Sequence, residues 1–276
     1  MVMSVNTNVG AMIALQNLNA TNAQLATTQS RINTGKSVST AKDNGAIWAI
    51  AQGQRAEIGA LNAVKQSLDR GVAAVDVALA AGETVSDLLL QMKEKALAAT
   101  DASLTTSARS ALNEDFKALR DQIASVTGNA DFNGINLLKT GATGFQALAN
   151  AAGTSTLTVG AEVMALGSTT VSVATTQSIE TLTKASASLT AVSNSIDAVS
   201  GALARLGTKS KALTTHITFV GKLSDALESG VGNLVDADLA KESAKLQALQ
   251  TKQQLGVQAL GIANQTPQLV LSLFRG

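Results

Sequence analysis

A heptad repeat of apolar residues is the feature that most constrains how this chain can fold. It spans residues 181–234, and its first stripe contains Leu182, Leu189, Ile196, Leu203, Ile217 and Val231. Its second stripe contains Ala185, Val192, Val199, Leu206, Leu213, Val220, Leu227 and Leu234. Because the offsets alternate between three and four, the stripes predict the seam of a coiled coil. Glycines at 221, 230 and 232 predict a break in this helix at 226–232.

A long helix with an apolar seam needs a partner, and the sequence supplies one upstream. Residues 58–92 carry apolar side chains at spacings of three and four, and a second helix is expected at 108–126 after a Ser/Thr-rich break. The predicted core of the coiled coil consists of Leu61, Leu68, Val75, Leu182, Leu189, Ile196, Leu203, Leu206 and Leu213.

The middle of the chain, residues 141–178, has a different character. Glycines punctuate it, and residues 154–159 and 169–173 alternate polar with apolar side chains. This pattern predicts one or two short β-hairpins. Few aromatic residues and a single proline elsewhere favour helices. The expected fold is therefore mainly α, a long antiparallel helical coiled-coil bundle with a small β-hairpin region in the middle of the chain.

Both ends of the chain predict a further pair of helices, of which the second is capped by Asp236 or Asp238. These helices are polar on most of their surface, so each alone should be marginal in water. Packing against copies of themselves would stabilise them, with about 1.5–3 kcal/mol for each buried Leu or Ile. The predicted assembly interface consists of Leu15, Leu18, Leu25, Ile32, Leu239, Leu246, Leu249, Val257, Leu260 and Leu271.

Charge and motif content argue against several functions. The formal net charge is +1 and aromatic residues make up 2% of the chain, so nucleic acid is not an expected partner. No apolar run is long enough to insert into a membrane, and the first residues lack the pattern of a cleaved secretory signal. No metal or nucleotide motif occurs, and His216, the single histidine, is expected on the surface or in packing. We therefore expect no catalytic, cofactor-binding or metal site.

Three blocks of sequence resemble the bacterial flagellin family. The first contains Val5-Asn6-Thr7-Asn8, Leu15-Gln16-Asn17-Leu18, Arg31-Ile32-Asn33-Thr34-Gly35 and Ala41-Lys42-Asp43-Asn44. The second is Asp131-Phe132-Asn133-Gly134 followed by Leu137-Leu138. The third contains Asp236-Ala237-Asp238, Ala263-Asn264-Gln265-Thr266-Pro267-Gln268 and Val270-Leu271-Ser272-Leu273-Phe274-Arg275. Several linked blocks in the family's order are specific, and the short middle resembles that of slim flagellins such as the alphaproteobacterial ones.

The resemblance implies a domain organisation and a set of partners. Residues 1–42 and 236–276 would form a terminal helical domain in the inner tube of the filament. Residues 43–140 and 179–235 would form a central coiled-coil domain, with 141–178 as its variable hairpin segment. The chain would polymerise with itself in the extracellular filament and serve motility. It would leave the cell without a cleaved signal peptide, handled by an export chaperone and the flagellar secretion apparatus, and would meet the filament cap and junction proteins.

Two other functions remain open at this level. A hook-filament junction protein resembles flagellins at its termini but does not form long filaments. A signalling coiled coil would predict a stable dimer of long helices and would not need the motifs at the two ends. The motif that contains Phe132 and the closing motif favour a filament subunit.

Overall fold

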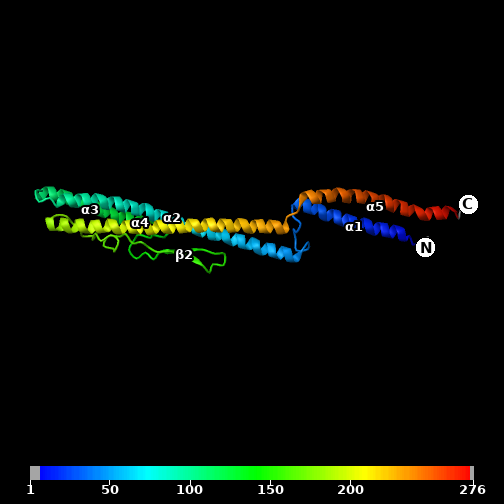
Figure 1. The fold of residues 1–276 in the computed structure, drawn as a ribbon, viewed down its shortest axis with the longest axis horizontal. Helices are drawn as coiled ribbons and strands as arrows, with labels where there is room; N and C mark the ends of the chain where they lie inside the picture. Colours follow the sequence, from blue (N-terminus) through cyan, green and yellow to red (C-terminus); the bar gives the residue numbers. More distant parts are fainter. Residues whose placement is uncertain (1–6, 274–276) are drawn as a thin grey trace. The chain divides into compact units, whose positions relative to one another are not determined.

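The computed structural model describes the backbone of residues 7–273 and the side chains of residues 7–265. Its elements are α1 (Val9–Thr34), α2 (Gly45–Ala99), α3 (Thr106–Asn129), β1 (Phe145–Leu148), β2 (Thr156–Val159), α4 (Leu182–Val235) and α5 (Leu239–Leu273) (Figure 1). The predicted fold class, a mainly helical antiparallel bundle with a small hairpin in the middle of the chain, is confirmed.

The chain divides into two compact units. One unit consists of Met1–Ala56 together with Ala226–Gly276, and the other consists of Glu57–Asp225. The first unit therefore joins the two ends of the chain, while the second has a core of its own. The domain boundaries expected at 42, 140, 178 and 236 stay a prediction.

Helix α2 carries a heptad row of buried residues in the second unit. Its members are Leu61, Val64, Leu68, Gly71, Val75, Ala78, Gly82, Val85, Leu89, Met92, Ala96 and Ala99. The spacing alternates between three and four throughout, which keeps one face of the helix against its neighbours. Leu61, Leu68 and Val75 of the predicted core all lie in this row.

Helix α4 runs antiparallel to α2 (Figure 1) and buries the second predicted stripe from Ala185 to Val220, but another row takes the place of the first stripe. Leu206 and Leu213 are buried, but the buried positions beside them include Ser188 and Ser195, whereas Leu189, Ile196 and Leu203 are only half-buried. The segment that precedes α4 explains the shift, because its polar groups need partners. The amide of Ser172 donates to Ser195 Oγ, and Ser188 Oγ donates to the carbonyl of Ser178.

Leu182 was predicted to be a core residue but is the most exposed of the predicted set. It is the first residue of α4, and 44% of its surface is exposed. No preceding helical turn shields it.

The break predicted at 226–232 is wrong, because α4 continues without interruption to Val235. This end of α4 belongs to the first unit, where the beginning of α2 also lies. Val231 and Val235 are buried there, and a Cβ added at Gly230 would lie 3.9 Å from Gln54 Oε1. Tertiary packing therefore outweighs the low helix propensity of glycine.

The connections in the second unit pack on the long helices. Helix α3 runs antiparallel to the end of α2, where Lys95 Nζ lies 2.8 Å from Asp115 Oδ2. Strands β1 and β2 form one antiparallel hairpin, in which Phe145 pairs with Val159. Residues 169–173, the second stretch of alternating pattern, form no strand; Val171 and Val173 are instead buried in an irregular segment.

Two glycines of the α2 row are sites of close approach. A Cβ added at Gly71 would lie 2.9 Å from Phe145 Cε2. A Cβ added at Gly82 would lie 2.7 Å from Leu203 Cδ2 and 3.2 Å from Met164 Sδ. The α2 glycines therefore leave room for side chains of the hairpin region and of α4.

This close approach predicts opposite effects for two glycine substitutions in α2. Gly82→Ala should lower the free energy of unfolding by about 1 kcal/mol or more, because crowding exceeds the gain in helix propensity. Gly59→Ala is the matched control, since nothing lies within 4 Å of a Cβ at that position. It should raise stability by about 0.5–1 kcal/mol. Urea unfolding monitored by circular dichroism measures both, and equal stabilisation by the two would contradict the packing described here.

Candidate assembly surface

Helices α1 and α5 pack side by side and antiparallel in the first unit (Figure 1). Polar contacts join them at three levels. Asn8 Nδ2 donates to the carbonyl of Ala263 at 2.7 Å, and Gln253 Nε2 donates to Asn22 Oδ1 at 2.7 Å. At the third level, Arg31 Nη1 donates to Glu242 Oε1 at 3.1 Å.

The seam between α1 and α5 is lined by small and polar side chains as well as leucines. Its less exposed positions are Ala11, Ala14, Leu18, Thr21, Leu25, Thr28, Arg31 and Ile32 on α1 and Glu242, Leu246, Leu249, Gln253, Gly256, Leu260 and Ala263 on α5. A Cβ added at Gly256 would lie 3.2 Å from Leu18 Cδ1, so the two helices approach closely there. The seam therefore buries little apolar area per turn compared with the α2 row.

The opposite faces of both helices expose large apolar side chains. On α1 these are Val9, Met12 and Ile13, which are adjacent on one face because residues three and four apart are neighbours on a helix. On α5 they include Leu255 and Ile262, seven residues apart. All five side chains are between 54% and 68% exposed. At about 100° per residue the α1 row points away from the seam and the α5 row lies outside it, so the described part of the pair carries an exposed apolar surface.

The predicted interface residues divide between the seam and the exposed surface. Six lie in the seam, where they are buried or half-buried: Leu18, Leu25, Ile32, Leu246, Leu249 and Leu260. Three are about half exposed: Leu15, Leu239 and Val257. The side chain of Leu271 lies outside the described residues.

The exposed rows on α1 and α5 were missed because one heptad register was followed in each helix. Val9, Met12, Ile13, Leu255 and Ile262 lie out of phase with that register. A second apolar row out of phase with the first was the available signal, since it indicates a helix with neighbours on two sides.

A shallow groove follows the α1–α5 pair. It has a volume of about 250 Å³ and is lined by Ala14, Asn17, Leu18, Thr21, Lys252, Leu255, Gly256 and Ala259. Because Ala14, Gly256 and Ala259 have little or no side chain, the groove is open to an incoming side chain.

A short joint, formed by residues 35–37 and 235–237, holds the end of α1 next to the start of α5. Helix α1 ends at Gly35, whose φ of 68° is in the left-handed region that favours glycine. The amide of Ser37 donates to the carbonyl of Val235 at 2.7 Å, and the amide of Ala237 donates to the carbonyl of Gly35 at 2.9 Å. Of the two possible caps of α5, Asp238 makes the contact: its Oδ1 accepts from the amide of Lys241.

Asp43 organises the loop that leads from this joint into α2. Its Oδ2 accepts hydrogen bonds from the amides and the hydroxyls of both Ser39 and Thr40. These bonds, led by the one from the Thr40 amide, favour the ionised carboxylate and lower the pKa of Asp43 below its usual value of 3.8. Asp43 therefore positions the loop between α1 and α2.

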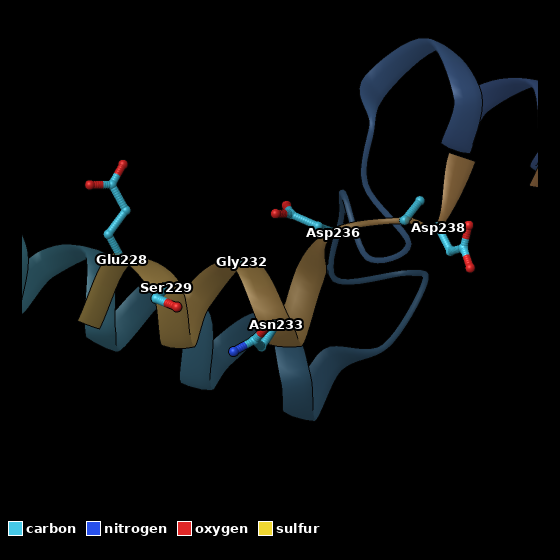
Figure 2. Close-up of a pocket in the computed structure, with 7 residues that line it drawn as sticks. Glu228, Ser229, Gly232, Asn233, Asp236 and Asp238 are labelled. Atoms are coloured by element: carbon cyan, nitrogen blue, oxygen red, sulfur yellow. The ribbon is translucent and has the colours of Figure 1, made fainter. Parts of the chain in front are cut away.

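The carboxylates near the joint do not converge on a common point. Figure 2 shows Glu228, Asp236 and Asp238 at an open pocket, with their carboxylates pointing in different directions. Among the described residues no group of three or more His, Cys, Asp or Glu is arranged to hold a metal ion. No helix within residues 7–273 is both long enough and apolar enough to cross a membrane. His216 lies elsewhere, with Nε2 2.7 Å from the carbonyl oxygen of Ala149.

The Asp43 turn predicts a specific pH response. Because the folded-state pKa is depressed, the carboxylate's stabilisation of the turn is present at neutral pH and is lost as the pH falls below about 3.8. The amide proton shifts of Ser39 and Thr40 should move together in an NMR titration, with a midpoint below the usual Asp value. Asp43→Asn should abolish this transition. A midpoint at or above 3.8 in the unmodified chain would contradict the hydrogen bonding described here.

Comparison with known proteins gives this geometry a context. The profile of the bacterial flagellin N-terminal helical region matches residues 5–143, and that of the bacterial flagellin C-terminal helical region matches residues 189–274. The chain is 56% identical to flagellin FljM of Caulobacter vibrioides, over 99% of this chain and 98% of that protein. It is 36% identical to a flagellin of Brucella melitensis, over 99% of each.

Solved structures share the fold. A Bacillus cereus flagellin aligns with 56% of this chain and 88% of its own, with a TM-score of 0.50 and 19% identity. A Vibrio parahaemolyticus protein assigned as hook-associated aligns with 70% of this chain and 100% of its own, with a TM-score of 0.59 and 16% identity. The matches at both ends of the sequence and along its full length agree with the paired terminal helices, and the chain belongs to the bacterial flagellin family.

Proposed function

We propose that α1 and α5 assemble this flagellin by packing their exposed apolar faces against other copies of the chain. As a member of its family, the chain is a structural subunit of the flagellar filament, a polymer on the outside of the bacterial cell. The observation that supports the role of α1 and α5 is the uncovered apolar surface on both helices of the pair.

The energetics of the pair favour a polymer over a free subunit. The α1–α5 seam contains threonines, a glycine and amide side chains, so it contributes little apolar burial. Burial of Val9, Met12, Ile13, Leu255 and Ile262 against neighbours would contribute about 1.5–3 kcal/mol for each side chain. A subunit that gains most of its terminal-helix stability from its neighbours adds to a growing end and does not form stable small oligomers on its own.

The assembly residues are proposed on this basis. Leu15, Leu239 and Val257 contact other subunits together with the exposed rows of α1 and α5. Six other predicted residues hold α1 against α5: Leu18, Leu25, Ile32, Leu246, Leu249 and Leu260. Residues 1–42 and 236–276 line the inner tube, and residues 43–140 and 179–235 form the shell around it. Residues 141–178 face solvent. Resemblance to flagellins supports this layout, as does the separate core of the second unit.

Further partners are proposed from the family alone. The chain passes through the flagellar secretion apparatus with the help of an export chaperone, and it is added beneath the filament cap, next to junction proteins at the filament base. The exposed row on α5 is a suitable surface for a chaperone to cover before assembly. The chain has no catalytic activity in this proposal, since its role is mechanical.

A hook-filament junction protein is the main alternative. The fold shared with the Vibrio parahaemolyticus protein supports it, although that likeness concerns the fold alone. A signalling coiled coil is a more distant alternative. Filament growth separates them, because a junction protein or a signalling dimer would not extend sheared flagellar filaments into long tubes.

Substitutions on the outer face of α5 test the proposed interface. Leu255→Ser combined with Ile262→Ser should raise the critical concentration for seeded polymerisation by about tenfold or more, because two apolar side chains lose their burial. Gln247→Ser is the matched control, since it changes an exposed polar residue of the same helix outside the row of Leu255 and Ile262. Sedimentation of filaments measures the soluble fraction. Equal critical concentrations for the double variant and the control would rule out this face as an interface.

A further inference from the structure

Arg31 and Glu242 form the one ion pair that joins α1 to α5 in the described part of the chain. Arg31 Nη1 lies 3.1 Å from Glu242 Oε1, and the two side chains are 32% and 12% exposed. The pair lies next to the joint at the roots of both helices, and the neighbouring seam positions are Thr28, Leu246 and Leu249. A carboxylate this far out of water needs its cationic partner.

The ion pair is only half completed. Arg31 Nε and Glu242 Oε2 are buried without a hydrogen-bond partner among the described residues, and so is Thr28 Oγ1, one turn away on α1. Arginine and carboxylate can form two parallel bonds, and here they form one. A single bond between side chains on different helices depends on the relative height of the two helices, because sliding one along the other separates Nη1 from Oε1.

We infer that the Arg31–Glu242 pair sets the register of α1 against α5 and thereby positions the apolar rows used in assembly. This inference rests on the proposed function of α1 and α5. Both residues act as positioning residues within one chain, and neither is the contact with the neighbouring copy.

The rest of the seam is uncharged. Its layers consist largely of Ala, Thr, Leu and Gly, and its other polar contacts are the bonds from Asn8 to the carbonyl of Ala263 and from Gln253 to Asn22. The charged layer is different. A slip of one heptad in one direction brings Arg31 opposite Leu249 and leaves its charge at an apolar position without its partner. A slip in the other direction brings Glu242 opposite Gln24, which supplies no charge to pair with the carboxylate. A single polar layer of this kind is an established way to fix coiled-coil register.

The register of α1 against α5 matters because one exposed apolar row belongs to α1 and the other belongs to α5. Val9, Met12 and Ile13 must be at the correct height relative to Leu255 and Ile262 if both rows are to meet neighbouring subunits at once. A slide of α5 by one turn changes that relative height by about 5.4 Å, which is more than the width of a side-chain contact. A subunit in the wrong register would therefore pack one row and lose the other.

Charge substitutions in the full-length chain test this inference. Arg31→Glu and Glu242→Arg should each raise the critical concentration for seeded polymerisation by about tenfold or more. The chain that carries both changes should polymerise within about threefold of the unmodified chain, because the pair is restored with its direction reversed. Gln247→Glu is the matched control, since it places a charge at an exposed position of α5 outside the seam. It should have little effect.

Mixing the two single variants distinguishes pairing within a chain from pairing between chains. The inference predicts that an equal mixture polymerises no better than either variant alone; rescue by mixing would overturn it in favour of a contact between copies. Failure of the doubly substituted chain, with its circular dichroism melting unchanged, would also overturn it, as would normal polymerisation of both single variants. In that last case the proposed function would stand. Failure of the unmodified chain to polymerise would overturn the proposed function and the inference together.

Discussion

The heptad row of α2 is the constraint on which the rest of the structure depends. It buries an apolar residue or a glycine every three or four positions from Leu61 to Ala99, and α4 runs antiparallel to it with buried residues of its own. The antiparallel arrangement brings the beginning of α2 and the end of α4 into the same unit. There the joint between Gly35 and Ala237 places the end of α1 beside the start of α5, so helices about 200 residues apart in sequence become partners.

The core of the second unit and the α1–α5 seam differ in how much apolar burial they contribute to stability. In the second unit, long apolar side chains and close-approach glycines form a core that needs no other subunit. In the α1–α5 pair, threonine, glycine, amide and charged side chains share the seam with leucines, while a second set of large apolar side chains lies exposed outside it. Apolar burial is thus completed within the chain at its middle and left incomplete at its ends, as expected for a subunit whose ends build a polymer.

Sequence reasoning succeeded where one periodic pattern dominated. The α2 row, the second stripe of α4 and the existence of the terminal helices follow from spacing, and the end motifs indicate the family directly. Sequence reasoning was less successful where a helix contacts a second neighbour besides its coiled-coil partner. Ser188 and Ser195 are buried because the segment before α4 has backbone and side-chain groups to satisfy, and Val9 and Ile262 are exposed because their helices have a second apolar face. Neither follows from one heptad register. Glycines 230 and 232 looked like a break because the packing of α2 beside them cannot be read from local propensity.

The most direct test of the account is seeded polymerisation of the intact chain, compared by electron microscopy with a chain that lacks residues 1–35 and 236–276. Circular dichroism should first establish that the shortened chain keeps its helices, since the second unit has its own core. The account predicts long tubes from the intact chain and none from the shortened one. Tubes from the shortened chain, or an intact chain that stays soluble in the presence of seeds, would contradict it.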